Sequence, residues 1–339
     1  MTIARRSLLL SAITVAAAGV FATSPLQAQN FYEGKTVTMI VPHSASGGFA
    51  KYAQLLAPEI QKQLKARTVK VEHHSGAGGL VGQNLVWVAK PDGLTFGLTS
   101  GPGLVLAQLG GAEGVQFDAV KFTWLGRAAL DDRVIFVGAK SPIKSVDDVV
   151  KLGRPFKVPS QGVDEDFYGM AMLADIFGFK PQFITGFEGG GDTTLTVVKG
   201  ETDGRLTSWT SAVPMLKTGD IRPILSVGEE RYKDQPDVPN ALDLVKDPVK
   251  RKTIQALINI QRVHRSLFGP PGMPPAAVNE LRAGILAALK DPQLQENAKK
   301  ANLPINPMDG ATQQKVVAEI YEASGDITRI LKAATATIK

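Results

Sequence analysis

Short apolar runs alternate with segments of helical periodicity over the first third of the chain. Residues 36–41 predict a buried strand, and apolar residues at helical spacing predict a helix over 49–64. A second strand (68–72), a second helix (80–89) and a third strand (94–99) follow in the same order. This repeated order predicts an α/β fold with a parallel sheet flanked by helices, and ligands bind at the carboxyl ends of such strands.

The alternation continues through the middle of the chain, and helical patterns dominate near the C-terminus. A polar stretch at 228–252 predicts an excursion over the surface. The further predicted elements are strands at 134–137, 156–159, 182–185, 204–207 and 221–227, and helices at 146–151, 166–177, 192–198, 212–216, 275–289, 293–301 and 311–335.

The N-terminal segment has the pattern of an export signal. Arg5 and Arg6 precede an apolar run, and small residues follow as far as Ala28. This layout is typical of a secretory signal peptide cleaved near Ala28, which predicts a periplasmic protein. A membrane anchor is the alternative, because the uncharged run 7–28 is long enough to span a bilayer, but a threonine, a glycine and a proline within it favour the signal peptide. The paired arginines leave the general secretory and twin-arginine routes open, and we favour the first.

The composition excludes several kinds of site. The 339 residues are enough for two domains. The chain has no cysteine, which rules out disulfides and thiol nucleophiles, and only four histidines, so no metal centre is expected. Removal of the leader takes away two arginines and lowers the formal net charge from +6 to +4. Basic residues do not cluster with aromatic ones, so nucleic-acid binding has no support.

Catalytic and phosphate-binding motifs fail in this sequence. The run 34–36 (Gly-Lys-Thr) resembles the end of a P-loop, but position 29, which should be glycine, is glutamine. No Gly-x-Ser-x-Gly elbow occurs. The acids at 131–132 and 164–166 would suit hydrolysis, yet such acids are more often solvated or stabilise a helix start. We therefore expect no enzyme and no cofactor.

Two glycine-rich loops carry the strongest signal. Residues 43–48 and 73–79 each follow a predicted strand and open a predicted helix. Glycine lets a ligand approach the backbone, and the first-turn amides of a helix are unpaired and lie at the positive end of its dipole. Two such helix starts facing each other predict a main-chain anion site that suits a carboxylate. The alternative is that both loops are ordinary tight turns.

Several short motifs occur in an order that points to one family. They are 41–48 (Val-Pro-His-Ser-Ala-Ser-Gly-Gly), 71–79 (Val-Glu-His-His-Ser-Gly-Ala-Gly-Gly), 90–95 (Lys-Pro-Asp-Gly-Leu-Thr), 200–203 (Gly-Glu-Thr-Asp), 217–224 (Lys-Thr-Gly-Asp-Ile-Arg-Pro-Ile) and 268–274 (Phe-Gly-Pro-Pro-Gly-Met-Pro). Together they resemble the Bug-type periplasmic receptors of tripartite tricarboxylate transporters, over about residues 35–330.

The resemblance implies a two-lobed periplasmic binding protein of the Venus-flytrap type. Each lobe would be a mainly parallel sheet flanked by helices, with the ligand in the cleft between the lobes. Lobe one would comprise residues 29–130 and 265–339, and lobe two residues 131–264. The chain would cross near 128–134 and return near 263–268, and closure would be a hinge motion.

Ligand contacts are expected from both lobes, those of lobe two from the family pattern. In lobe one the candidates are His43, Ser44, Ser46, Gly47, Gly48, Phe49, His73, Ser75, Gly78, Gly79, Thr99 and Ser100. In lobe two they are Ser160, Gln161, Phe187, Glu188, Gly189, Ser208 and Trp209.

The chain departs from the family pattern at side chains around both loops. Phe49 and Ala50 stand where a hydroxyl residue and an aspartate are usual, and residues 73–75 read His-His-Ser in place of Asn-Arg-Pro. The pair 187–188 is Phe-Glu in place of Tyr-Lys. These changes indicate an acid that is aromatic or less polar than citrate or malate. Drift at positions without ligand contact explains them equally well.

The resemblance implies a receptor that binds a small carboxylate, with an aromatic acid or a dicarboxylate as candidates. It would deliver this ligand to the large and small membrane permease subunits of a tripartite tricarboxylate-type transporter, and we expect a monomer. A hydrolase or lyase that acts on a carboxylate in the same cleft is one alternative. A ligand-sensing subunit of a membrane signalling protein is another.

Overall fold

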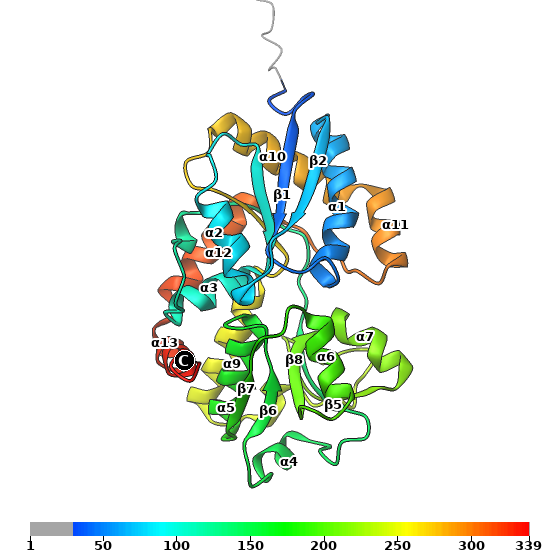
Figure 1. The fold of residues 1–339 in the computed structure, drawn as a ribbon, viewed down its shortest axis with the longest axis vertical. Helices are drawn as coiled ribbons and strands as arrows, with labels where there is room; N and C mark the ends of the chain where they lie inside the picture. Colours follow the sequence, from blue (N-terminus) through cyan, green and yellow to red (C-terminus); the bar gives the residue numbers. More distant parts are fainter. Residues whose placement is uncertain (1–29, 339) are drawn as a thin grey trace, which may run out of the picture. The chain divides into compact units, whose positions relative to one another are not determined.

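Two separated parts of the chain build the first sheet of the computed structural model, which describes residues 30–338 (Figure 1). Its strand order is β11-β4-β10-β3-β1-β2, and β1 pairs in parallel with both β2 and β3. The predicted signal peptide at 1–28 lies outside the described residues. The strands are β1 (Thr36–Val41), β2 (Thr68–His73), β3 (Thr95–Thr99), β4 (Thr123–Arg127), β10 (Ser266–Gly269) and β11 (Met308–Asp309).

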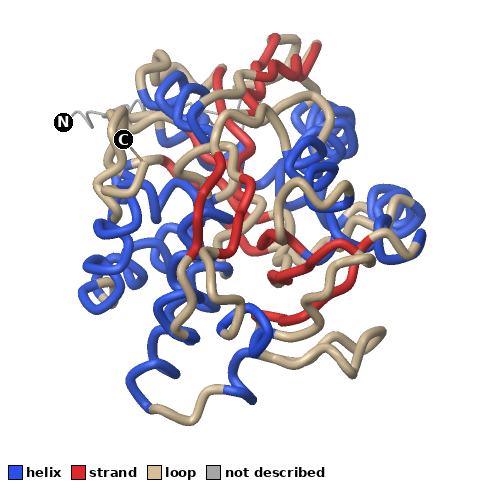
Figure 2. The backbone as a smooth tube through the Cα atoms, turned by 60° about the horizontal axis from the view of Figure 1, so that its bottom comes forward, coloured by secondary structure: helices blue, strands red, loops and turns tan. Residues whose placement is uncertain are grey.

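Helices flank this sheet, and we call the sheet with its helices the first lobe (Figures 1 and 2). The spacing of apolar residues on α1 buries Tyr52, Leu56 and Ile60 against α10 and the parallel strands. The helices are α1 (Gly48–Leu64), α2 (Leu80–Trp87), α3 (Gly101–Leu109), α10 (Pro275–Lys290), α11 (Pro292–Lys300) and α12 (Gly310–Glu322), with 3₁₀ turns at Ala77–Gly79 and Ala119–Lys121.

The second lobe is built around strands from the middle of the chain. One sheet has the order β8-β5-β9, and β6 pairs in parallel with β7. The strands are β5 (Arg133–Gly138), β6 (Phe156–Pro159), β7 (Pro181–Ile184), β8 (Gly204–Ser208) and β9 (Ile221–Val227). The helices are α4 (Val146–Val150), α5 (Glu165–Phe177), α6 (Gly190–Val198), α7 (Trp209–Thr218), α8 (Ala241–Leu244) and α9 (Pro248–Gln261).

Each time the chain passes from one lobe to the other, it joins the sheet of the new lobe as an antiparallel strand. β5 lies between β8 and β9, which α7 connects, and β10 lies between β3 and β4, which α3 connects. The first residue of β5, Arg133, is paired with Ser208, the last residue of β8. A chain that arrives from the other lobe starts at the carboxyl edge of its new sheet, so it runs opposite to its neighbours.

The predicted two-lobed α/β fold is confirmed, with one correction. Parallel pairing is found in β1–β3 and in β6–β7, but the three-stranded sheet of the second lobe is antiparallel, because the crossing strand β5 lies at its centre. The predicted lobe boundaries at 130/131 and 264/265 stay a prediction.

The apolar core is continuous between the lobes. One cluster extends from Val105 of α3 through Phe167 of α5 to Leu331 of α13 (Gly325–Thr335). The hydroxyls of Tyr168 and Thr335 lie 2.9 Å apart, so the last helix packs on α5 of the second lobe. Within residues 30–338 no helix has the length and hydrophobicity needed to cross a bilayer.

Candidate functional site

A cavity of about 90 Å³ lies where strands of both lobes end, which is room for several water-sized groups. Nine of the predicted site residues line it: His43, Ser44, Gly47, Gly48, Phe49, Gly78, Ser100, Gln161 and Ser208. The other lining residues are Gly103, Arg133, Asp164, Glu165, Asp166, Gly190, Arg205, Thr207, Ser211, His264 and Arg265.

The lobes touch at the rim of this cavity through glycines. The Gly78 amide donates to the carbonyl oxygen of Gln161 at 3.2 Å, and a Cβ on Gly162 would lie 3.1 Å from the Gly78 nitrogen. A Cβ on Gly189 would lie 2.8 Å from the Ser44 hydroxyl oxygen. Side chains at these positions would hold the lobes apart, so the structure is a closed form.

The second glycine loop does not offer the free donors expected of it. The Gly78 amide is bonded across the lobes, and the Gly79 amide donates to the Gly76 carbonyl at 2.9 Å. Gly79 is buried behind the cavity, where a Cβ would lie 3.3 Å from the Pro42 carbonyl oxygen. Both amides are therefore bonded within the protein in this closed form, and the expectation that they face a ligand stays a prediction.

Uncapped helix starts from both lobes reach the cavity instead. α1 begins after Gly47, and no side chain among the described residues caps it. α6 begins after Gly189, and there too residues 30–338 supply no side-chain cap. The unpaired first-turn amides of both helices therefore carry positive partial charge toward the cavity.

Arg265 lies beside the start of α1. Its side chain is 2% exposed, and its guanidinium lies 4.2 Å from the Phe49 ring and 4.8 Å from the Tyr52 ring. A Cβ on Gly48 would be 2.9 Å from Nη2 of Arg265, so glycine is what lets the guanidinium approach the helix start.

The donors of Arg265 are incompletely used. Nη2 lies 3.4 Å from a carboxylate oxygen of Asp131 and 3.4 Å from the Ser208 hydroxyl, and Nε has no hydrogen-bond partner among the described residues. Asp131 also accepts from the hydroxyl and the amide of Thr210. A guanidinium with spare donors at a helix start suits a carboxylate.

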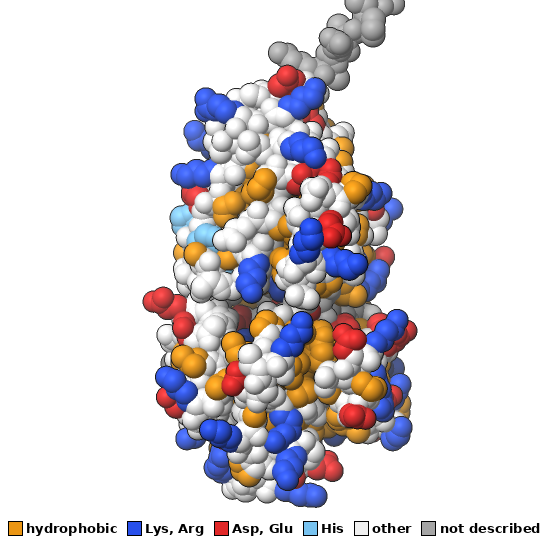
Figure 3. Space-filling view, turned by 90° about the vertical axis from the view of Figure 1, so that its right-hand side faces the viewer, with side chains coloured by type: hydrophobic (Ala, Val, Ile, Leu, Met, Phe, Trp, Pro, Cys, Tyr) orange, Lys and Arg blue, Asp and Glu red, His pale blue; other side chains and the backbone are white. Residues whose placement is uncertain are grey.

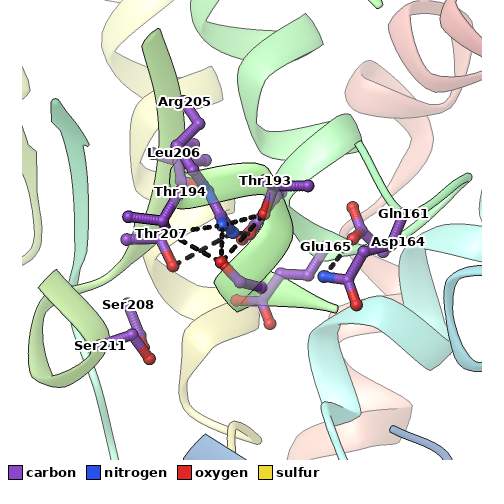
Figure 4. Close-up of polar contacts among 12 residues, drawn as sticks. Gln161, Asp164, Glu165, Thr193, Thr194, Arg205, Leu206, Thr207, Ser208 and Ser211 are labelled. Atoms are coloured by element: carbon purple, nitrogen blue, oxygen red, sulfur yellow. Dashed lines mark hydrogen bonds and ion pairs between the residues drawn. The ribbon is translucent and has the colours of Figure 1, made fainter. Parts of the chain in front are cut away.

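Two more arginines, Arg133 and Arg205, both pair with Asp166. Figure 4 shows Arg205 beside the hydroxyls of Thr193, Thr194 and Thr207. Nη2 of Arg205 is 2.6 Å from Asp166, and Arg133 also contacts Asp166 and lies 3.4 Å from Oε1 of Glu165. Arg205 also donates to the hydroxyl of Thr193. Burial lowers the pKa of Arg205 to about 10, so it stays cationic at neutral pH.

The start of α5 presents acids to the cavity. Asp164 is the N-cap and accepts from the Phe167 amide at 2.9 Å, and burial raises its pKa to about 6. Glu165 is 6% exposed, and its Oε2 accepts from the Ser100 hydroxyl. Its Oε1 has no hydrogen-bond partner in the described part of the chain. An acceptor therefore remains at this end of the cavity.

The two histidines of the cavity are neutral. His43 stacks on Phe49 with 4.0 Å between ring centroids, and burial lowers its pKa to about 3. Burial, followed by the neighbouring Arg265, also lowers the pKa of His264. Nε2 of His43 and Nδ1 of His264 have no partner among residues 30–338, so they can donate to or accept from a ligand.

Five predicted residues of the first lobe lie outside the cavity lining. Besides Gly79, they include His73, whose Nδ1–H donates to the His43 carbonyl at 3.0 Å, and Thr99, whose hydroxyl accepts from a side-chain amide at 3.1 Å. Ser75 is exposed, and Ser46 lines the neighbouring groove.

Five predicted residues of the second lobe also lie outside it. The Ser160 hydroxyl donates to a main-chain carbonyl of its own loop at 2.5 Å. Phe187 is half-buried and Glu188 is exposed, whereas Gly189 packs near the first loop. Trp209 stacks on a tyrosine ring with 3.7 Å between centroids.

An apolar groove of about 760 Å³ adjoins the cavity and shares Gly47, Gly48 and Gly190 with it. Hydrophobic side chains gather on this face of the molecule (Figure 3). They come chiefly from α6 and α7: Leu195, Val198, Val213, Pro214 and Met215, with Leu303.

Residues 52–333 match the family model of the tripartite tricarboxylate transporter family receptor. The chain belongs to this receptor family. The resemblance seen in the sequence is thereby confirmed, and membership of this family implies a periplasmic, solute-binding protein.

Individual relatives of this receptor are distant. A UPF0065 protein of Agrobacterium vitis is 26% identical over 310 residues, which cover 87% of this chain and 84% of that protein. The periplasmic binding protein BugD has a similar structure, with a TM-score of 0.74 at 20% identity over 89% of this chain and 98% of BugD. MatC of Rhodopseudomonas palustris, solved with malate, has a TM-score of 0.69 at 21% identity over 89% and 99% of the two chains.

Sequence reasoning missed the charged lining of this receptor's cavity. Arg133, Arg205, His264 and Arg265 belong to no motif, and the acids at 164–166 were assigned to helix capping or solvent. The predicted lobe boundaries could have identified most of them, because residues next to the points where the chain passes between the lobes must lie at the edge of the cleft. Treating 131–133 and 264–265 as cleft residues for that reason identifies Arg133, His264 and Arg265.

Proposed function

We propose that this chain is the extracytoplasmic receptor of a tripartite tricarboxylate-type transporter and binds a small carboxylate in the cavity between its lobes. The observation that carries the proposal is the uncapped start of α1 beside the buried guanidinium of Arg265. Main-chain amides at a helix start and a guanidinium both stabilise a carboxylate. The nine predicted residues that line the cavity are its proposed contacts, together with Arg265.

The receptor is proposed to act as a periplasmic monomer after cleavage of its leader near Ala28. It delivers the ligand to the large and small permease subunits and performs no chemistry on it. Malate in MatC supports a carboxylate ligand for this family, and aromatic acids and dicarboxylates are the first to test. Mass spectrometry of the exported protein is expected to find an N-terminus near Gln29.

A thermal-shift screen of mature protein against aliphatic and aromatic carboxylates tests the proposal. A ligand at one hundred times its Kd stabilises the folded state by about 2.7 kcal/mol. Each acid is paired with its neutral amide, which keeps shape and removes charge. Calorimetric titration of the hits is expected to give one site and unchanged ligand. Consumption of the ligand would assign the cleft to a hydrolase or lyase, and preference for the amides would overturn the carboxylate site.

A further inference from the structure

The cavity proposed for a carboxylate is itself rich in carboxylates. Asp164, Glu165 and Asp166 all line it, and Asp131 pairs with the arginine that is proposed to receive the ligand. Asp131 is 4% exposed, and Glu165 is 6% exposed. A site built for a ligand with several negative charges would avoid this arrangement, because like charges repel strongly at low dielectric constant.

The arginines do not outweigh these acids. Arg133 and Arg205 pair with Asp166, and Arg265 pairs with Asp131. Within the described part of the chain, three arginines and four acids line the cavity or pair with its lining, and the two histidines are neutral. The charged side chains of the site therefore sum to one negative charge before a ligand enters, and the partial charges of the helix starts are all that opposes it.

Ligands of different charge change this balance differently. A dicarboxylate adds two negative charges and brings the sum over side chains and ligand to three negative charges, more than two helix starts can offset. A monocarboxylate with an ammonium group adds none. Buried charge without compensation is strongly unfavourable, so the second kind of ligand suits this cavity better.

The structure also contains an acceptor for the ammonium group. Oε1 of Glu165 has no hydrogen-bond partner among residues 30–338, although Arg133 lies 3.4 Å away. One oxygen of Asp164 accepts only a long bond of 3.4 Å from Gln161. Both acids are at least nine-tenths buried and line the cavity. Buried polar atoms normally have hydrogen-bond partners, so their remaining lone pairs indicate a donor that is part of the ligand.

We infer that the ligand carries a positively charged nitrogen group as well as one carboxylate, and that this receptor selects zwitterionic monocarboxylates over dicarboxylates. The carboxylate lies at the start of α1 and Arg265, and the nitrogen group lies at Glu165 and Asp164. The inference rests on the proposed function and narrows its ligand class.

Calorimetric titration with matched ligand triplets tests the inference. Each triplet keeps the carbon chain and changes one end: succinate, 4-aminobutyrate and butyrate; glutarate, 5-aminopentanoate and pentanoate; adipate, 6-aminohexanoate and hexanoate. Terephthalate, 4-(aminomethyl)benzoate and 4-methylbenzoate form an aromatic triplet. In the triplet that binds best, we expect the amino acid to bind at least tenfold more tightly than both companions. A dicarboxylate that binds as tightly as its amino partner overturns the inference and leaves the proposed function standing. No binding by any acid overturns both.

Glu165→Gln is the decisive variant, since it removes one charge and keeps the shape. We expect the affinity ratio of amino acid to dicarboxylate to fall at least tenfold, while the methyl-ended acid binds as before. Glu201→Gln, an exposed acid of the same lobe, is the matched control and should leave the ratio unchanged. Should Glu165→Gln fail to fold, Asp164→Asn replaces it, because asparagine also caps helices. An unchanged ratio in the folded variant contradicts the inference.

Discussion

The substitution Gly48→Ala at the start of α1 should weaken ligand binding without weakening the fold. The added methyl would lie 2.9 Å from Nη2 and 3.2 Å from Nη1 of Arg265, closer than a Cβ contact tolerates. The guanidinium would have to leave its place over Phe49 and Tyr52, and the methyl would occupy the space in front of the helix amides. A hydrogen bond to a charged group contributes about 1.5–3 kcal/mol, so carboxylate affinity should fall by about 10–150-fold.

The same change should not weaken the fold. Gly48 lies in the first turn of α1 and does not have a left-handed φ, and alanine favours a helix over glycine by up to about 1 kcal/mol. Movement of the guanidinium offsets part of that gain, so urea unfolding should show stability near that of the wild type. Gly191→Ala, in the first turn of α6 with open space around it, is the control and should bind normally. Titration of Gly48→Ala that gives a Kd within threefold of the wild type would refute a ligand site at this helix start.

Three further changes test the closed form and the buried charges. Gly78 has a φ of 69°, and a Cβ there would lie 3.0 Å from a main-chain nitrogen of the second lobe, so Gly78→Ala should favour the open form. Small-angle scattering of the variant should show a larger radius of gyration than that of the wild type. An unchanged scattering profile counts against the contact between the lobes at Gly78. Burial raises the pKa of Asp132 from 3.8 to about 6, so the folded state keeps a proton that the unfolded chain releases earlier, and the free energy of unfolding falls as pH rises from about 4 to 6. Asp132→Asn should remove that pH dependence and raise the free energy of unfolding by about 1–3 kcal/mol at pH 7 but by little at pH 4. Urea unfolding at the two pH values measures both changes. Equal increases at pH 4 and pH 7 would contradict the raised pKa. Asp166→Asn removes the carboxylate charge that compensates Arg133 and Arg205, so the free energy of unfolding should fall by about 3–5 kcal/mol in the same assay. A loss below about 1 kcal/mol would mean that water already solvates the two guanidinium groups.

Elements with a strong local pattern were predictable from the sequence. The predicted strand at 36–41 coincides with β1, and the predicted helix at 49–64 differs from α1 by one residue. Their hydrophobic periods lie within the segment itself, so no tertiary information is needed. α9 was not predicted, because its first turns are basic and polar and its buried face shows only from Ile254 onward. The predicted helix at 311–335 is in fact two helices, and the chain breaks near Ser324 to place α13 on the second lobe.

The candidate site was predictable only where the backbone defines it. The first glycine loop predicts a helix start at the ligand site, and α1 does begin at the cavity. The second loop has a similar composition, but the Gly78 amide bonds to Gln161 of the other lobe, a tertiary contact that no local pattern encodes. Arg265 and Gly48 lie far apart in the chain and meet only in the folded structure, so no local pattern around either residue predicts their contact.

The location of β10 determines the order in which the lobes can be completed. β3 and β4 each pair with β10 and not with each other, so the first sheet keeps a gap at its centre until residues 266–269 are present. The strands of the second lobe all lie within residues 133–227, and that lobe needs no later strand. Pulse-labelling hydrogen exchange during refolding should therefore protect amides of β5 and β8 before those of β3 and β4; simultaneous protection would contradict this order.

While the gap persists, β3 and β4 present unpaired backbone groups to any neighbouring chain, which is the usual start of edge-to-edge aggregation. A truncation before β10 would make that state permanent, whereas one after β10 would keep this central strand and remove β11 and the helices α10 to α13. The chain therefore depends on a strand near its C-terminal end to cover β3 and β4, and chaperones that hold nascent chains apart would act on these two strands rather than on the ligand-binding loops.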